Sequence, residues 1–331
     1  MPDPRLDVLC IGNAIVDVIA NASDDFLSQE GLVKGSMRLI DAEEAERLYA
    51  HMGPAHQVSG GSAGNTAAGV AALGGRSGFI GQVAPDQLGQ FYRHDLTATG
   101  VEFITPASDV GEPTARSMIL VTPDGHRTMN TFLGAAQHLP KEALDEKQIR
   151  DSAILYLEGY LWDPETPRYA MVRAIEVARN AGRMVSFTLS DTFCVERHRD
   201  GFNQLLGSGR IDVLFANQAE VEALAGVAHL GTAVAAIAPK VGTLVVTRSE
   251  DGAIAVRDGE RADVPAEPIR ELVDTTGAGD LFAAGFLFGT ARGQSLERCL
   301  RLGAICAAEV IQHYGARPEA DLRALAGELA A

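Results

Sequence analysis

The sequence predicts an α/β fold: a three-layer α/β/α domain with a mainly parallel central sheet, together with a small antiparallel β-sheet that forms a lid. From residue 154 onward, short apolar runs alternate with amphipathic helical segments, as in a parallel sheet covered on both faces. Between 101 and 131, apolar and polar residues alternate around a Pro-Asp-Gly turn at 123–125, as in a hairpin with one solvent face.

The individual elements follow from local patterns. Segment 6–20 holds two strand-like apolar runs that meet at Gly12. Segments 42–52 and 65–73 have helical character, and two glycines at 74 and 75 end the second one. Strands are expected at 77–83, 115–122, 126–131, 154–157, 184–189, 213–216 and 244–247, and further helices at 167–181, 218–225, 281–289 and 295–312.

The chain has no repeat and no Pro- or Ser-rich linker, so we expect one domain over 1–331. The lid is expected to consist of parts of 13–40 and 101–131 inserted into that domain.

The composition excludes several classes of partner. The net charge of −16 and the absence of a dense Lys/Arg run argue against nucleic acid and an anionic membrane surface. The four cysteines have no metal-site spacing, no run of about 18 apolar residues occurs, and the first residues do not resemble a signal peptide. These features predict a cytoplasmic protein with reduced cysteines.

The strongest chemical signal is DTTGAGD at 274–280, which leads directly into an apolar helix. The glycines let the backbone turn so that N–H groups of Gly277, Ala278 and Gly279 converge at a helix N-terminus, which favours a phosphoryl group and an ionised Asp280. Such a pair could serve as anion hole and general base in phosphoryl transfer. A Gly-rich turn with an Asp helix cap is the structural alternative. The P-loop and dinucleotide motifs are absent.

A second Gly-rich segment, GGSAGN at 60–65, leads into an Ala-rich helix with Asn65 near its start. The Asn amide could bind ligand hydroxyls. The same residues match GxSxG around Ser62, so a serine hydrolase is an alternative. It is disfavoured because 52–58 is a poor strand and because His313, the candidate base, falls on the expected C-terminal helix.

Three weaker signals remain open. Asn217 and Glu220 form an NxxE after an apolar run, which could hold Mg²⁺ through water or simply cap a helix. Segment 245–252 is a strand that runs into a Gly-containing loop, where a nucleotide or an ordinary turn would fit. Asp17 lies in an apolar run, either on its solvent face or in contact with polar substrate groups.

Taken in this order, these five segments resemble the PfkB (ribokinase-like) family of carbohydrate and nucleoside kinases over residues 7–317. The chain is most similar to the adenosine-kinase branch. The similar segments are NAIVD at 13–17, GGSAGN at 60–65, LGAA at 133–136, YLEGY at 156–160, FTLSDTF at 187–193 and LFANQAE at 214–220.

The resemblance implies a ribokinase-like fold and a role for each matching position. Asp280 would be the base and Gly277 to Gly279 the anion hole. Substrate would contact Asn13, Asp17, Gly61, Asn65, Leu133, Ala135 and Phe193, with Asp17 on ribose hydroxyls. Nucleotide would contact Asn217, Thr247, Gly252, Thr275, Gly277 and Gly279, and Asn217 with Glu220 would hold Mg²⁺ through water.

Several positions depart from the family pattern. Met37 stands where eukaryotic adenosine kinases tend to have Gln near the purine. Ser249 replaces the first Gly of the TxGxxG nucleotide loop, although Thr247 and Gly252 remain. Glu158 and Trp162 add a charge and a bulky ring near the expected acceptor site, without an assigned role.

The expected function is therefore an ATP-dependent kinase of purine salvage that phosphorylates the primary hydroxyl of a nucleoside, adenosine to AMP. A sugar kinase acting on ribose, fructose or a related sugar is the alternative within the family. A serine hydrolase and a catalytically inactive binding module are the alternatives outside it. The expected cofactors are ATP and Mg²⁺, with dependence on a monovalent cation left open, in a monomer or homodimer.

Overall fold

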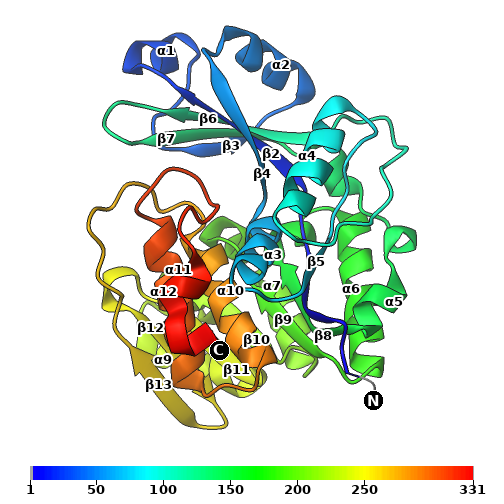
Figure 1. Cartoon of the computed structure of the whole chain (residues 1–331), viewed down its shortest axis with the longest axis vertical. Helices are drawn as coiled ribbons and strands as arrows, with labels where there is room; N and C mark the ends of the chain where they lie inside the picture. Colours follow the sequence, from blue (N-terminus) through cyan, green and yellow to red (C-terminus); the bar gives the residue numbers. More distant parts are fainter. Residues whose placement is uncertain (1–2, 331) are drawn as a thin grey trace.

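The computed structural model describes residues 3–330 and contains an eight-stranded sheet in the order β13-β12-β11-β10-β9-β8-β1-β5 (Figure 1). The six strands from β11 to β5 are parallel, whereas β12 pairs antiparallel with both β11 and the edge strand β13. The strands are β1 Leu6–Ile11, β5 Ser77–Ile80, β8 Ser152–Glu158, β9 Met184–Thr188, β10 Val213–Asn217, β11 Thr243–Thr247, β12 Ala253–Arg257 and β13 Glu260–Val264.

Helices cover both faces of this large sheet, because its central strands are apolar on both sides. In β1, Leu9 and Ile11 face one core and Val8 and Cys10 face the other. The first core contains α6 Glu165–Asn180, α7 Thr192–Gly207, α8 Gln218–Ala225 and α9 Leu230–Ile237; the second contains α3 Ser62–Ala72, α10 Ala278–Ala291 and α11 Leu296–Val310. The predicted three-layer α/β/α arrangement is confirmed.

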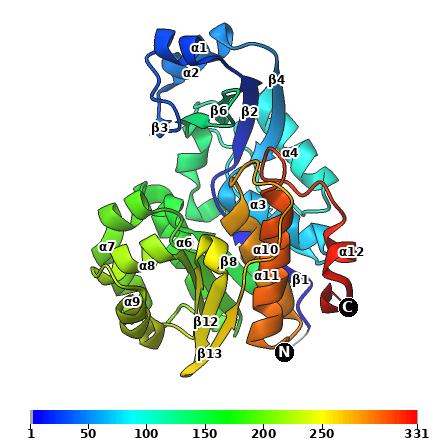
Figure 2. The ribbon, with the colours of Figure 1, turned by 90° about the vertical axis from the view of Figure 1, so that its left-hand side faces the viewer.

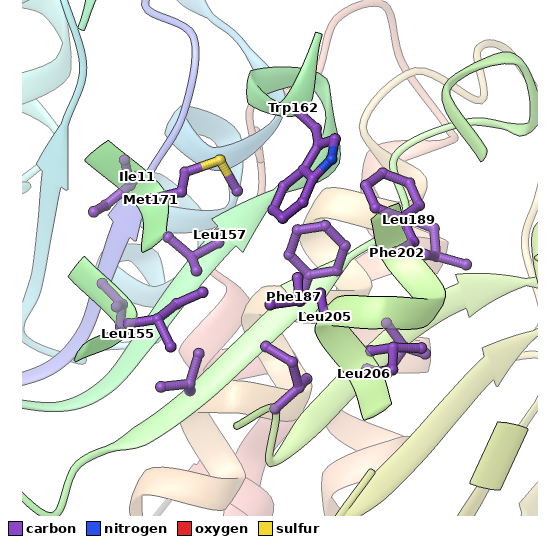
Figure 3. Close-up of a cluster of buried hydrophobic side chains, with 14 of the residues drawn as sticks. Ile11, Leu155, Leu157, Trp162, Met171, Phe187, Leu189, Phe202, Leu205 and Leu206 are labelled. Carbon is purple, nitrogen blue, oxygen red and sulfur yellow. The ribbon is translucent and has the colours of Figure 1, made fainter. Parts of the chain in front are cut away.

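An aromatic group lies at the centre of the first core (Figure 3). The rings of Phe187 and Phe202 lie 5.3 Å apart, and the Trp162 ring lies 5.7 Å from that of Phe202, both near edge-to-face. Trp162 is 8% exposed. The bulky ring that the sequence left without a role is therefore part of the core.

The second sheet lies above the large one and has the order β3-β7-β6-β2-β4 (Figures 1 and 2). The expectation of antiparallel pairing holds for β2–β4 and β6–β7, whereas β2–β6 and β3–β7 are parallel. The strands are β2 Ile15–Asn21, β3 Met37–Leu39, β4 Ala55–Gly60, β6 Ala115–Val121 and β7 Arg127–Phe132. Helices α1 Asp24–Gln29 and α2 Ala42–His51 pack on it through Leu27 and Leu48.

Strand β4 lies outside the ranges expected for the lid, and the residue pattern of 52–58 indicated a poor strand. Its first three residues, Ala55 to Gln57, are exposed, and it is an edge strand. An edge strand of this kind is held by pairing with β2 and carries little apolar periodicity, which explains the wrong expectation.

The strands of the second sheet meet the rest of the molecule along one row, which we call the boundary row: Gly60, Ile15, Ala115 and Phe132. These are the last residue of β4, the first of β2, the first of β6 and the last of β7. Ile15 pairs with both Gly60 and Ala115, and Phe132 pairs with the neighbour of Ala115. The chain therefore enters or leaves these four strands, on the side of the large sheet, at positions that lie along one line.

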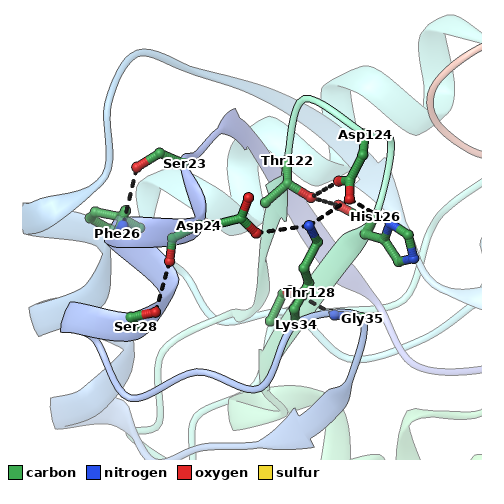
Figure 4. Close-up of polar contacts among 10 residues, drawn as sticks. All are labelled: Ser23, Asp24, Phe26, Ser28, Lys34, Gly35, Thr122, Asp124, His126 and Thr128. Atoms are coloured by element: carbon green, nitrogen blue, oxygen red, sulfur yellow. Dashed lines mark hydrogen bonds and ion pairs between the residues drawn. The ribbon is translucent and has the colours of Figure 1, made fainter.

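At the far end of the second sheet, Lys34 joins two separate segments (Figure 4). Its ammonium nitrogen lies 2.7 Å from Asp24 in α1 and 2.6 Å from Asp124 in the β6–β7 turn. Because both carboxylates are more than half exposed, water and salt weaken this pairing, and it contributes little to stability.

The other expected elements correspond to observed ones, with shifted ends. Helix α10 begins at Ala278, so the last residues of DTTGAGD form its first turn. Helix α11 ends at Val310, which leaves His313 beyond the helix. Helices α4 Gln87–Ala98, α5 Glu146–Arg150 and α12 Leu322–Ala326 complete the set. Within residues 3–330, no single helix is long and apolar enough to cross a membrane.

We expect the loss of an aromatic ring to lower stability according to how deeply that ring is buried. Phe187→Ala should lower the free energy of unfolding by about 3–5 kcal/mol, because it removes a fully buried ring and leaves a cavity. Phe193→Ala removes the same atoms from a side chain that is 71% exposed and should change it by less than about 0.5 kcal/mol. Denaturant unfolding of both variants measures the difference; equal effects would contradict the role of the group.

Candidate active site

A cavity of about 870 Å³ lies between the two sheets and falls in the range typical of small-molecule sites. From the large sheet it is lined by Glu158, Thr188, Asn217 and Thr247, which end β8, β9, β10 and β11. Side chains of Asp17, Ser117, Met129 and Thr131 line it from the second sheet. Ligands in open α/β sheets bind at this carboxyl edge.

The first turn of α10 forms part of the cavity wall. Gly277 is the N-cap residue with φ of 80°, and a Cβ there would lie 2.6 Å from the Cβ of Ala316, so only glycine fits. Ala278, Gly279 and Asp280 follow as the first helical residues, and all line the cavity. The N–H groups of a first turn have no intrahelical partner, although that of Ala278 donates to the Thr275 carbonyl over 3.2 Å, and the helix dipole is positive here. This wall suits an anion.

Asp280 is held by two side chains from the start of α3. Ser62 Oγ donates to Asp280 Oδ1 over 2.6 Å, and Asn65 Nδ2 donates to Oδ2 over 2.9 Å. Each oxygen keeps a second lone pair. Burial raises the pKa of Asp280, while these hydrogen bonds and the charge of Arg317 oppose the rise. The helix N-terminus, which is visible in the sequence, favours ionisation; desolvation acts in the opposite direction and makes the carboxylate a stronger base.

Asp17 reaches the cavity from β2 and lies against the backbone of β4. A Cβ on Gly60 would lie 2.2 Å from Asp17 Oδ2, so the first glycine of GGSAGN provides room for this carboxylate. The second, Gly61, has φ of 86°, and a Cβ there would lie 2.1 Å from the Asn13 carbonyl oxygen. Burial raises the pKa of Asp17 to about 7, although Arg127 and Arg317 favour the ionised form.

A buried ion pair joins the second sheet to the DTTGAGD loop. Arg127 Nη1 in β7 lies 2.7 Å from Asp274 Oδ2, and both side chains are less than a tenth exposed. Asp274 also accepts from the N–H groups of Thr276 and Gly315 at 3.0 Å. Sequence reasoning missed Arg127, because an arginine in an alternating hairpin has the pattern of a solvent-facing residue.

Asn217 and Glu220 form a capping box at the start of α8. Asn217 N–H donates to Glu220 Oε2 over 2.9 Å, its Nδ2 donates to Oε1 over 2.6 Å, and Glu220 N–H donates to Asn217 Oδ1. The capping alternative of the sequence is therefore present. Burial raises the pKa of Glu220 to about 7, and its carboxylate lines the cavity. A carboxylate that keeps lone pairs here fits Mg²⁺ held through water. The described residues contain no cluster of three His, Cys, Asp or Glu side chains suited to direct ligation.

The cavity brings together most of the residues that the sequence singled out. Its lining includes Asn13, Asp17, Gly61, Asn65, Leu133, Glu158, Phe193, Asn217, Glu220, Thr247, Gly277, Ala278, Gly279 and Asp280. Met37, also singled out, lines it from β3 and is 49% exposed.

Three expected residues do not line the cavity. Ala135 is fully buried behind its wall. Thr275 is exposed, and its neighbour Thr276 lines the cavity instead. Gly252 packs against β13, where a Cβ would lie 2.0 Å from the Val264 carbonyl oxygen. This close packing requires a glycine whether or not a nucleotide binds nearby. Ser249 has φ of 50°, a conformation that glycine adopts more easily.

The serine hydrolase alternative finds no support in the geometry. Ser62 donates to Asp280, and within the described part of the chain it has no histidine partner. His313 instead contacts Glu309 at 3.2 Å. A nucleophilic serine requires a base within hydrogen-bond reach.

Polar residues that sequence reasoning did not single out form another part of the cavity wall: Tyr160, Asp163, Ser190, Asp191 and Arg197. Ser190 has φ of 76°, and its Oγ accepts from the Gly159 N–H over 2.8 Å. FTLSDTF at 187–193 pointed to this segment, but a strained serine conformation has no sequence signature.

Comparison with known proteins gives one consistent result. Residues 5–322 match the family model described as pfkB family carbohydrate kinase. An adenosine kinase structure from Sinorhizobium meliloti is 50% identical, with a TM-score of 0.91 over 97% of this chain and 98% of that one. A probable sugar kinase structure from Rhizobium etli CFN 42 is 49% identical, with a TM-score of 0.92 over 98% of each chain. Adenosine kinase of Saccharomyces cerevisiae is 28% identical over 93% of this chain and 95% of its own length.

The raised pKa of Asp17 predicts that its charge destabilises the fold. A carboxylate whose folded pKa is about 7, above the unfolded value near 4, contributes stability at low pH that is lost as pH rises through 7. Asp17→Asn should therefore raise the free energy of unfolding at pH 8 by up to about 4 kcal/mol, with the gain shrinking toward pH 4. Thermal unfolding between pH 4 and 8 checks this, and a gain independent of pH would contradict it.

Proposed function

The chain belongs to the pfkB family of carbohydrate kinases, and we propose that it transfers the γ-phosphate of ATP to the primary hydroxyl of a nucleoside, adenosine in the first place. Membership makes it a phosphotransferase with an alcohol acceptor and ATP as the co-substrate. The identity of the alcohol is the part that we propose.

One observation carries the proposal: Asp280 lies in the first turn of α10, with both carboxylate oxygens oriented by α3. A base for an alcohol and a positive helix end for the transferred phosphoryl group thus share one wall of the cavity. Asp17 lines the same cavity from the second sheet.

This geometry supports a role for each residue. Asp17, with Asn13 and Asn65 nearby in the lining, would bind neighbouring hydroxyls of the acceptor and so direct its primary hydroxyl toward Asp280. Asp280 would take the proton of that hydroxyl as the oxygen attacks the γ-phosphorus in line. The first turn of α10 would stabilise the charge on the phosphoryl oxygens.

Nucleotide and metal would lie along the other part of the lining. Asn217 ends β10, Thr247 ends the neighbouring strand β11, and Glu220 lies in the first turn of α8. All three line the same cavity as the first turn of α10, and we assign them to ATP binding. Mg²⁺, held by Glu220 through water, would neutralise phosphate charge. The second sheet, which carries Asp17, would exclude water as a lid.

The choice of a nucleoside rests on two features. The Sinorhizobium meliloti relative, 50% identical, is an adenosine kinase. The exposed apolar side chains Met37 and Phe193 line the cavity and offer a surface that fits a flat base better than a bare sugar. The 49% identical probable sugar kinase supports a sugar acceptor as the second candidate.

Removal of the base gives a direct test of mechanism. Asp280→Asn keeps the shape of the side chain and should lower kcat by about 10²–10⁴, because general-base assistance is lost. Steady-state kinetics with saturating ATP measure it. Asp212→Asn, at the amino end of β10, is the matched control and should keep wild-type kcat. A kcat for Asp280→Asn within a few-fold of wild type would exclude this role.

A panel of acceptors tests the substrate. ATP consumption is measured with adenosine, guanosine, inosine, cytidine, ribose and fructose at equal concentrations. Adenosine should give the highest kcat/KM, since the apolar wall adds binding that a sugar alone cannot use. Fructose or ribose giving the highest value would replace the nucleoside by the sugar alternative.

A further inference from the structure

Two chain crossings between the sheets meet beside one buried carboxylate. Segment 12–14 joins β1 to β2, and Gly61 joins β4 to α3. Glu158, the last residue of β8, lies between them and is 0% exposed.

Glu158 accepts one hydrogen bond from each crossing. The backbone N–H of Asn13 donates to its Oε1 over 2.7 Å, and the backbone N–H of Ala63, at the start of α3, donates to its Oε2 over 2.8 Å. A Cβ on Gly12 would lie 2.3 Å from Oε2, so the first crossing passes directly over the carboxylate. No Lys, Arg or His forms an ion pair with Glu158 within residues 3–330, so hydrogen bonds from the Asn13 and Ala63 backbone and from the Asn13 side chain are what stabilise its charge.

Arg317 donates hydrogen bonds to backbone carbonyl oxygens on either side of the second crossing. Its Nε donates to the Ser59 carbonyl over 3.0 Å, and its Nη1 donates to that of Gly64 over 2.8 Å. Its Nη2 donates to Ser59 Oγ over 3.1 Å and closely contacts the Ser59 carbonyl. The guanidinium thus bridges the residues on either side of Gly61. Arg317 itself does not line the cavity.

The segment held in this way carries the side chains that orient the base. Ser62 and Asn65 donate to Asp280, and Gly60 lies against Asp17. The Glu158 carboxylate accepts from N–H groups of the segment, and the Arg317 guanidinium donates to its carbonyl oxygens. Charged partners at both kinds of backbone group therefore fix the position of the segment.

We propose that Glu158 and Arg317 are positioning residues for the acceptor, which fix the β4–α3 connection so that Asp17 and Asp280 face the same alcohol. This inference rests on the proposed kinase function, but it gives a role to residues that do not contact Asp280. Arg317 does not line the cavity either.

A carboxylate is the side chain that this place requires. Two N–H groups converge from different segments, and a glutamine amide offers only one acceptor atom, so one N–H would face an NH₂ group. Burial raises the pKa of Glu158 to about 7, so the fold retains a group that is costly to ionise. Such a cost is typical of residues kept for function rather than stability.

The experiment compares Glu158→Gln with Arg317→Lys and Arg317→Met, using the acceptor that is most active with the wild-type enzyme. Glu158→Gln and Arg317→Met should lower kcat/KM for the acceptor by about 10- to 100-fold, since small displacements of a reacting group have effects of this size. KM for ATP should stay within about 2-fold. Arg317→Lys keeps the charge but cannot bridge both carbonyls, so it should rescue only part of the loss.

Two further measurements separate positioning from a general loss of structure. Asp7→Asn is the matched control: Asp7 is a buried carboxylate that accepts the Arg76 N–H over 2.9 Å, at the opposite end of β1. It should lower stability while leaving kcat/KM for the acceptor unchanged. Amide hydrogen exchange at Asn13 and Ala63 should accelerate in Glu158→Gln, a readout that requires no substrate.

Each outcome decides the matter. Faster exchange with a selective loss for the acceptor supports positioning. Faster exchange with unchanged acceptor kinetics, or equal losses for ATP and acceptor, overturns it. A wild-type enzyme that phosphorylates no alcohol contradicts the proposed function instead. If Glu158→Gln does not fold, Arg317→Met decides, and acceptor kinetics equal to those of Asp7→Asn would overturn the inference.

Discussion

Helices α3 and α10 begin side by side, and the hydrogen bonds from Ser62 and Asn65 to Asp280 join their first turns. The close approach depends on Gly69, where a Cβ would lie 2.6 Å from Leu281. Because α3 follows directly from β4 and α10 from the DTTGAGD loop, this contact fixes where the second sheet, the first turn of α10 and Asp280 lie relative to one another. The cavity and its chemistry depend on that arrangement.

Periodicity and glycine placement predicted the six parallel strands of the large sheet but not β12 and β13. The apolar strands buried on both faces and the helices between them leave a strong local signal, and a family resemblance spread over the chain added the order of the site segments. Residues from all six similar segments and from DTTGAGD line one cavity, including Asp17 and Asp280, which are 263 positions apart (280 − 17). Their chemical roles stay predictions until kinetics test them.

Three features that escaped prediction share a physical cause: each depends on partners far along the chain. Strand β4 is recognisable only from its pairing with β2. The burial of Arg127 and Arg317 depends on Asp274 and on backbone carbonyls of 59–64. The pKa of Asp280 was argued from the helix end alone, because desolvation is a property of the assembled cavity.

The boundary row has a mechanical consequence. For any rotation of the second sheet about that line, displacement grows with distance along the strands, at about 3.3 Å per residue. Asp17 lies two residues from Ile15, and Val121 lies six from Ala115. The lever arms are thus about 7 and 20 Å, so a rotation of about 10° would shift the hairpin tip by about 3 Å but Asp17 by only about 1 Å. Asp17, the carboxylate that the second sheet contributes to the cavity, would therefore move much less than the hairpin tip.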